Sequence, residues 1–188
     1  MKLVLASKSP RRREILGMVY KDFTVRVSDA SEEYDGSMEL IDVPQLLAER
    51  KAECVEISDD EIVIGCDTVV IHNGKLLGKP RDESEAIEML ESMSGTAHLV
   101  VSGICVRDKS TVVSDTVVTE VTMRPLEREE IERYVYTCHP TDKAGAYGIQ
   151  EMAGAFVEGI RGDFYNVVGL PLCKLCCILK EKFGFNGD

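Results

Sequence analysis

The amino-acid sequence predicts an α/β protein with a mixed β-sheet flanked by helices. Apolar segments of strand length alternate along the chain with segments of helical periodicity. Residues 62–65 form a continuous apolar run, which is typical of a strand buried on both faces. Asn73-Gly74 predicts a two-residue hairpin turn. The 188 residues contain no internal repeat and no linker-like segment, so we expect a single domain over residues 1–188.

The first strands and helices follow from capping and alternation signals. A strand, "KLVLAS", leads into a helix over residues 11–19, because Ser9 is a good N-cap and Pro10 suits the first helical position. "FTVRVSD" alternates like a second strand and is followed by an acidic loop, "SEEYDGSMELIDV". A second helix is expected over residues 44–56, with Pro44 at its first position.

The hairpin follows the buried apolar run. We expect that strand to end at Asp67 and the turn to pair His72 with Lys75. Counting back along both strands places Lys79 opposite Thr68 and beside Asp67. The sequence therefore predicts that a carboxylate and a lysine lie close together where the strand ends.

The remaining elements complete the alternation. "DESEAIEMLESMSG" reads as a helix with a capping box from Asp82 and Glu85 and a stop at Gly95. "AHLVVSGICVR" and "STVVSDTVVTEVTM" are long strands that we expect to be antiparallel, and "PLEREEIERYVYTC" is a helix that opens at Pro125. "DKAGAYGIQ" is a glycine-rich loop, "GAFVEGI" a short strand, and residues 170–183 a final helix.

Charge and hydropathy exclude several classes of partner. The formal net charge of −11 argues against a nucleic-acid-binding protein, since such proteins usually present a basic face. No apolar run approaches the roughly 20 residues of a membrane-spanning helix, and the N-terminal apolar stretch is far too short for a signal peptide. We therefore expect a cytoplasmic protein with no nucleic-acid or membrane partner, in which any anion site is a local basic pocket.

The cysteines are expected to be reduced and to act as small core residues, because most stand inside apolar segments. "CKLCC" contains a C-x-x-C, but no second pair stands near it with zinc-ligand spacing. The seven are Cys54, Cys66, Cys105, Cys138, Cys173, Cys176 and Cys177.

Three arginines occupy the first turn of the first predicted helix. Arg11, Arg12 and Arg13 stand at the positive end of the helix dipole, where each cation costs roughly 0.3–1 kcal/mol unless an anion offsets it. A solvated basic surface is the usual reading of such a run. The alternative is a phosphate site, for which the forked guanidinium groups and the hydroxyl of Ser7 are well suited.

A second group of candidates is acidic or inward-facing. Asp67 follows the buried run, where it could begin the hairpin, form a salt bridge with Lys79 or hold a metal. Lys51 lies on the apolar face of the second predicted helix, where it either extends to solvent or reaches a cleft. Glu32 and Glu33 are typical of a solvated loop, yet they also offer the oxygen ligands that Mg²⁺ prefers. The residues alone thus indicate metal-assisted phosphate chemistry, with structural roles still open.

The motifs "LASKSPRRREIL", "IGCDTVV" followed by "LGKPRD", "MSG", "DKAGAYGIQ" and "VVGLPL" resemble the Maf family of nucleotide pyrophosphatases, in order over nearly the whole chain. The resemblance implies a fold like that of inosine triphosphate pyrophosphatases, with an elongated mixed sheet in two lobes and a central cleft. It implies hydrolysis of a nucleoside triphosphate to the monophosphate and pyrophosphate, by water attack on the α-phosphorus. It further implies a divalent metal, Mg²⁺ or Mn²⁺, and a protein that is commonly a homodimer.

The resemblance also implies which residues form the site. The catalytic residues would be Asp67, Lys51, Lys79, Glu32 and Arg12. The substrate-binding residues would be Ser7, Arg11, Arg12, Thr68, Lys79 and Gln150. Glu32 and Asp67 would hold the metal, and Glu32 stands in "SDASEEYD", which departs from the family's usual spacing of acidic residues.

Three positions discriminate within the family. The branch similar to 7-methyl-GTP pyrophosphatases has Trp at the position of Arg11, Gln at that of Thr68 and Glu near Gln150, so this chain is similar to the dTTP/UTP branch. The expected substrates are dTTP and UTP, with modified pyrimidine nucleotides as a further class. The same chemistry on CTP or 7-methyl-GTP stays open, as does a non-catalytic cell-division regulator that binds a protein or a nucleic acid.

Overall fold

The computed structural model describes residues 1–27 and 29–187, and the packing of the chain divides it into two compact units. The first unit consists of Met1–Thr68, Ser102–Val117 and Gly169–Asp188. The second consists of Val69–Val101 and Val118–Val168.

Three strands run through both units: β3 (Glu61–His72), β5 (Ala97–Arg107) and β6 (Val112–Met123). The first unit adds β1 (Lys2–Leu5), α1 (Pro10–Val19), β2 (Phe23–Val25), α2 (Val43–Glu53) and α6 (Leu172–Phe183). The second adds β4 (Lys75–Leu77), α3 (Glu83–Met93), α4 (Arg128–Cys138), β7 (Val157–Arg161) and α5 (Phe164–Val168). Three 3₁₀ turns, η1 (Pro140–Asp142), η2 (Ala144–Ala146) and η3 (Met152–Phe156), also belong to the second unit.

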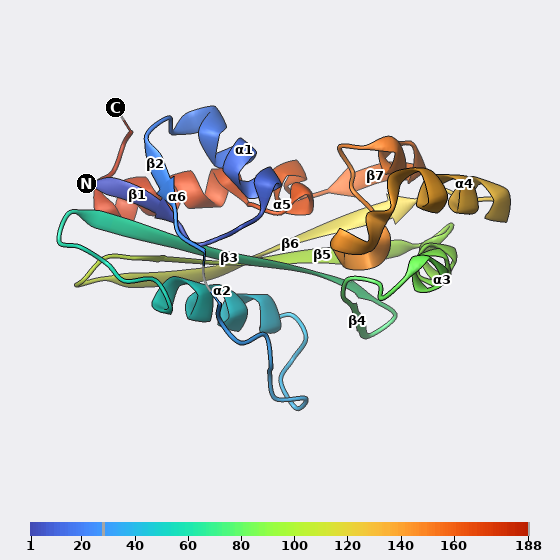
Figure 1. Cartoon of the computed structure of the whole chain (residues 1–188), viewed down its shortest axis with the longest axis horizontal. Coiled ribbons are helices and arrows are strands. Elements are labelled where there is room, and N and C mark those ends of the chain that lie inside the picture. The colour runs from blue at the N-terminus through green and yellow to red at the C-terminus, as the bar shows by residue number, and fades with distance from the viewer. Residues whose placement is uncertain (28, 188) are drawn as a thin grey trace. The chain divides into compact units, whose positions relative to one another are not determined.

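The strands form one seven-stranded mixed sheet (Figure 1). Their order is β2-β1-β3-β5-β6-β7, and β4 pairs with β3. β1 runs parallel to both β2 and β3, whereas β4 is antiparallel to β3 and β7 is antiparallel to β6. The predicted α/β class with a mixed sheet is therefore confirmed.

Helices cover both faces of the sheet in the first unit. In Figure 1, α2 lies on one face of β3, and α1 and α6 lie on the other. α2 approaches the sheet at two strand glycines: a Cβ added at Gly65 would lie 2.2 Å from the Ala48 carbonyl oxygen, and one at Gly103 would lie 2.2 Å from the Pro44 carbonyl oxygen. Only glycine lets the helix backbone come this close. The buried core here includes Val4, Ala48, Ala52, Val55 and Val63.

The predicted end of β3 is wrong. The strand does not stop at Asp67 but continues to His72, because the β-branched residues Thr68, Val69, Val70 and Ile71 keep favouring extended backbone. Asp67 is therefore a residue in the middle of a long strand, not a residue at its end.

The hairpin register is confirmed near the turn and fails farther away. His72 pairs with Lys75, as predicted, and Val70 pairs with Leu77. β4 ends at Leu77, and the next carbonyl, that of Gly78, accepts a hydrogen bond from the Gly145 amide. Strand pairing therefore does not extend to Lys79, and the predicted register opposite Thr68 is wrong.

The second predicted strand is shorter than expected. β2 ends at Val25, and the predicted range also includes Ser28, which lies outside the described residues. Arg26 donates hydrogen bonds to both carboxylate oxygens of Glu61 on β3. This bonding, with the amide of Ser58, lowers the pKa of the Glu61 carboxyl to about 2. The ion pair therefore ties the segment just after β2 to the start of β3.

Several helices also differ from the prediction: α2 ends at Glu53 rather than at residue 56, and α4 and α5 differ as well. α4 begins at Arg128 rather than at Pro125, because the Leu126 amide donates to the Ser94 hydroxyl at 2.7 Å and Glu127 has extended backbone. α5 was not predicted, since its five residues are too few to show a helical period. The N-cap predictions hold: the Ser9 and Asp82 side chains accept hydrogen bonds from the Arg12 and Glu85 amides.

The expectation that most cysteines lie in the core is wrong. Only Cys66 and Cys105 are buried, and Cys54, Cys173 and Cys177 are exposed. Cys173 and Cys177 lie on α6, which is amphipathic, so part of that apolar segment faces solvent. All seven cysteines are among the described residues, and none of them forms a disulfide. Within the described part of the chain, no helix has the length and apolar character needed to cross a membrane.

The second unit has a core of its own, which contains a buried polar pair. Tyr134 and Phe156 pack edge to face in this core, with ring centroids 5.2 Å apart. His98 and Tyr147 are also buried, and the Nε2 atom of His98 lies 2.7 Å from the Tyr147 hydroxyl. This bond fastens the glycine-rich loop that follows η2 to β5. Sequence reasoning missed the pair because nothing local links residues 98 and 147.

The burial of His98 predicts a pH dependence of stability. Burial lowers the pKa of His98 to about 4, and the neighbouring His72 ring lowers it further. The unfolded state, with an ordinary pKa of about 6.5, binds more protons between these values, so the free energy of unfolding falls as the pH drops from about 6.5 to about 4. We expect His98 to contribute on the order of 3 kcal/mol to this loss.

Urea unfolding of the wild type and of His98→Gln at pH 7 and at pH 4 measures this contribution. The wild type should lose more stability between the two values than the variant does. An equal loss in both proteins would contradict the assignment to His98.

Candidate active site

The guanidinium of Arg12, on the first turn of α1, links three segments of the first unit. Its Nε donates to the Gly169 carbonyl at 2.8 Å. Its Nη1 donates to the Ser7 hydroxyl at the end of β1, and its Nη2 donates to the Thr68 hydroxyl on β3, each at 3.2 Å. Among the described residues these bonds use three of the five guanidinium N–H groups, which leaves two for an anion.

The hydroxyl of Thr68 joins the same polar cluster. It lies 2.8 Å from the Ser102 hydroxyl on β5 and 3.2 Å from the Gly169 carbonyl. The thiol of Cys66 donates to this carbonyl at 3.3 Å, and burial raises the pKa of that thiol. Cys66 therefore stays protonated and serves as a donor within the fold rather than as a nucleophile.

The other two arginines of α1 differ in exposure. Arg11 is half-buried on the first helical turn, and Arg13 is exposed. The Ser7 hydroxyl, which is buried, also accepts from the Ser9 amide at 3.3 Å. The N-terminal turn of α1 thus presents two further cations beside Arg12, together with a buried hydroxyl.

A lysine between two carboxylates forms the second part of the site. Lys51 on α2 places its Nζ 2.5 Å from Oδ1 of Asp67 and 3.3 Å from Oε1 of Glu32. Lys51 and Asp67 are nearly buried, with side chains 14% and 12% exposed, whereas the Glu32 side chain is 70% exposed. The lysine that was expected on the inward helix face therefore does reach another candidate site residue, Asp67, and Glu32 contacts the same lysine from the acidic loop.

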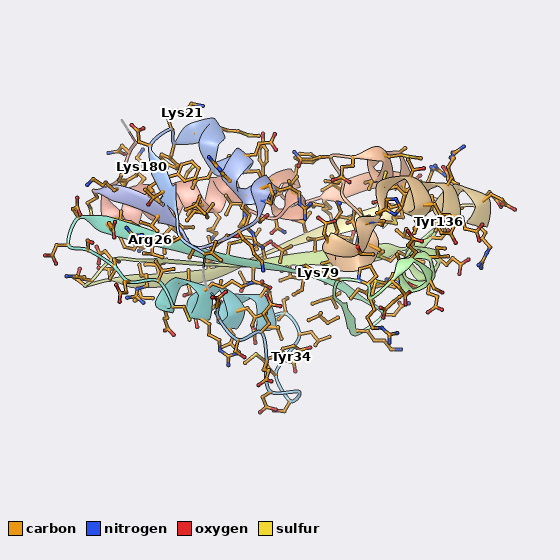
Figure 2. All side chains as sticks on the ribbon, viewed as in Figure 1. Lys21, Arg26, Tyr34, Lys79, Tyr136 and Lys180 are labelled. Atoms are coloured by element: carbon orange, nitrogen blue, oxygen red, sulfur yellow. The ribbon has the colours of Figure 1, made fainter. Side chains whose placement is uncertain are left out.

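The last two predicted site residues belong to the second unit. Lys79 follows β4 and is exposed, and Figure 2 labels its side chain. Gln150 is also exposed and lies three residues after Tyr147. Their part in a common site with the residues of the first unit stays a prediction.

The donor chemistry of the first unit suits a hard divalent cation. Two carboxylates, of Asp67 and Glu32, converge on one cationic atom, the Nζ of Lys51. No group of three or more His, Cys, Asp or Glu side chains that could hold a metal occurs among residues 1–27 and 29–187. Mg²⁺ is usually held by one or two carboxylates, with water and substrate oxygens completing its shell. The carboxylate pair fits such an ion, whereas a closed structural metal centre would need more protein ligands.

These features define a class of protein. Cationic side chains and a hydroxyl at a helix N-terminus suit a phosphate group, and the two nearby carboxylates suit a divalent cation. The combination is typical of proteins that act on phosphate esters or anhydrides.

Comparison with known proteins identifies the family. The family model described as "Maf-like protein" matches residues 2–182, and this chain belongs to the Maf family. A dTTP/UTP pyrophosphatase of Alkaliphilus metalliredigens is 48% identical over 189 residues, which cover 98% of each chain. A protein of the same name from Clostridium novyi is 48% identical, over 93% of this chain and 94% of the other.

Solved structures of Ham1 proteins are similar to part of the chain. The Staphylococcus aureus protein has 13% sequence identity and a TM-score of 0.42, over 65% of this chain and 72% of the other. The Coxiella burnetii protein has 10% identity and the same TM-score, over 65% and 73% of the two chains.

Proposed function

We propose that this protein is a cytoplasmic dTTP/UTP pyrophosphatase that cleaves its substrate to the nucleoside monophosphate and pyrophosphate. Near-full-length identity of 48% to proteins that bear this name carries the proposal. The site supports it, since a phosphate-binding helix turn and a carboxylate pair suit a metal-assisted attack on a phosphoric anhydride. Modified pyrimidine nucleotides are a further substrate class.

The cationic side chains bind and orient the triphosphate. Arg12 is held by three hydrogen bonds, so its remaining N–H groups are already aimed before the substrate arrives. Donors that are held in place stabilise developing negative charge with little reorganisation. Arg11, Ser7 and Thr68 extend this surface in the first unit, and Lys79 and Gln150 would contribute from the second.

Asp67 and Glu32 act on the water molecule that attacks the phosphorus. A water molecule attacks the α-phosphorus, the bond to the bridging oxygen of the β-phosphate breaks, and pyrophosphate leaves. Asp67 is the better placed of the two to take the proton of the attacking water, because its carboxylate is nearly buried and held in position by Lys51, whereas the Glu32 side chain is 70% exposed. Glu32 and Asp67 would hold Mg²⁺ or Mn²⁺, which when bound polarises the phosphoryl group and lowers the pKa of water. Lys51 supplies positive charge next to both carboxylates.

A nucleotide panel tests the proposed function. Purified protein with Mg²⁺ should convert dTTP and UTP to monophosphate and pyrophosphate at least about tenfold faster than CTP, GTP or 7-methyl-GTP, since pockets that read a base edge discriminate at this level or better. Both products are quantified for each nucleotide, with and without EDTA. Turnover of 7-methyl-GTP alone would contradict the substrate assignment and keep the chemistry. No turnover of any nucleotide with Mg²⁺ or Mn²⁺ would contradict the enzymatic function.

Size-exclusion chromatography with light scattering tests the homodimer that the family resemblance implies. A mass near twice the 20.8 kDa of one chain would support it.

A further inference from the structure

We propose that Arg50 is a positioning residue that holds Glu32 in place for the divalent cation. Arg50 is the residue on α2 directly before Lys51, and its Nη1 donates to the backbone carbonyls of Ser31 and Glu33. These are the residues on either side of Glu32. Because the inference concerns the metal site of the proposed function, it rests on that function.

The loop that carries Glu32 gains little from burial. From residue 29 to residue 42 most side chains are exposed, and Tyr34, labelled on this loop in Figure 2, is 38% exposed. Its hydrogen bonds within the loop, such as Glu33 amide to Ser31 hydroxyl and Met38 amide to Asp35 carbonyl, shape the loop but do not attach it to α2. A segment of this kind has low local stability.

Arg50 supplies such an attachment without using a carboxylate. Its guanidinium binds two main-chain oxygens, so it restrains the loop while the Glu32 side chain stays available to a cation. Lys51 restrains the same loop through the Glu32 carboxylate itself, at 3.3 Å. An incoming metal would compete with Lys51 for that carboxylate, but it does not compete with Arg50.

The order of residues on α2 separates the contact with the loop main chain from the contact with the carboxylates. Adjacent helix residues point about 100° apart, so Arg50 and Lys51 meet different parts of the loop. Arg50 is half-buried and turns to the Ser31 and Glu33 carbonyls, while Lys51 turns to Asp67. Outer-sphere groups that orient a metal ligand commonly change metal affinity 10–100-fold when they are removed.

Mn²⁺ binding to the nucleotide-free protein tests the proposal. The amount of free Mn²⁺, measured by electron paramagnetic resonance, gives the dissociation constant of the wild type, Arg50→Gln and Arg50→Lys. We expect Arg50→Gln to bind Mn²⁺ about tenfold more weakly and Arg50→Lys to recover part of the loss, because lysine keeps a donor. Loss of a positive charge from an acidic protein would by itself strengthen cation binding, so this expected change has the opposite sign to a general charge effect.

Arg128→Gln is the matched control. Arg128 lies on α4 in ion pairs with Glu91 and Glu132, and its replacement removes the same charge away from the proposed machinery. It should leave the Mn²⁺ affinity unchanged or slightly stronger. A double-mutant cycle with Glu32→Gln adds a second test: once Glu32 is gone, Arg50→Gln should have no further effect.

Three outcomes would overturn the inference: unchanged Mn²⁺ affinity in Arg50→Gln, additive effects in the cycle, or no Mn²⁺ binding by the wild type. Hydrolysis of dTTP by the wild type is measured in parallel. Its failure would overturn the proposed function itself, so the two results are distinguishable.

Discussion

Asp67→Asn should lower kcat for dTTP by about a thousandfold or more, on the scale of the roughly 10³–10⁵ in kcat that a single charged side chain can supply in phosphoryl transfer. The substitution keeps the shape of the side chain. It removes the negative charge that binds Lys51 at 2.5 Å and that would hold the metal or accept a proton from water. The measurement is pyrophosphate release at saturating dTTP and Mg²⁺, with thermal unfolding recorded to show that the variant is folded.

Asp115→Asn provides the control for this result. Asp115 also forms an ion pair with a lysine of the first unit, Lys174 at 2.8 Å, but this pair is about 40% exposed and has no proposed role in the reaction. Its replacement should leave kcat within twofold of the wild type and should cost about 1 kcal/mol of stability or less, which is what pairs at such exposure contribute. An Asp67→Asn protein that is folded and retains more than a tenth of the wild-type kcat would remove Asp67 from the chemistry.

Gly103→Ala should destabilise the protein by about 3 kcal/mol or more, at the upper end of the usual cost of overpacking. The added Cβ would lie 2.2 Å from the Pro44 carbonyl oxygen and 2.3 Å from the Gln45 amide nitrogen, and neither backbone atom can swing away as a side chain would. For a chain of 188 residues, this corresponds to a fall in the unfolding temperature of about 6–12 °C. Differential scanning calorimetry measures the change.

Two further glycines provide a second test and a control for this prediction. Gly65→Ala should behave in the same way, since its Cβ would lie 2.2 Å from the Ala48 carbonyl oxygen of the same helix. Gly159 lies in β7 with no heavy atom within 4 Å of an added Cβ, so Gly159→Ala should change the unfolding temperature little. If Gly103→Ala, Gly65→Ala and Gly159→Ala unfolded at the same temperature, the close approach of α2 to the sheet would not be the reason why a side chain at Gly65 or Gly103 is destabilising.

The two strand glycines also serve the candidate site. They set how near α2 lies to the sheet, and that approach lets the Nζ of Lys51 reach Asp67 on β3. Stability and function are therefore coupled at α2. A variant that pushes the helix outward should lose turnover as well as stability.

The sequence by itself determined the fold class, most of the elements and the Ser9 cap, because these depend on signals within a few residues. Alternation, caps and the Asn73-Gly74 turn act locally, and the predicted pairing of His72 with Lys75 is correct for the same reason. The family motifs are likewise segments of continuous sequence, so the amino-acid sequence is sufficient to indicate family membership. The sequence also placed Lys51 on the inward face of its helix, where it binds Asp67.

Only the tertiary structure decided how those segments meet. Two of the three bonds of Arg12, to Gly169 and Thr68, and the contact of Arg50 with the acidic loop depend on partners 17 to 157 residues away. The Gly169 carbonyl accepts hydrogen bonds from Arg12, Cys66 and Thr68. No sequence pattern marks a main-chain oxygen as such an acceptor. Local propensities fix what each segment forms, whereas burial and hydrogen bonding between distant segments fix which side chains can act together.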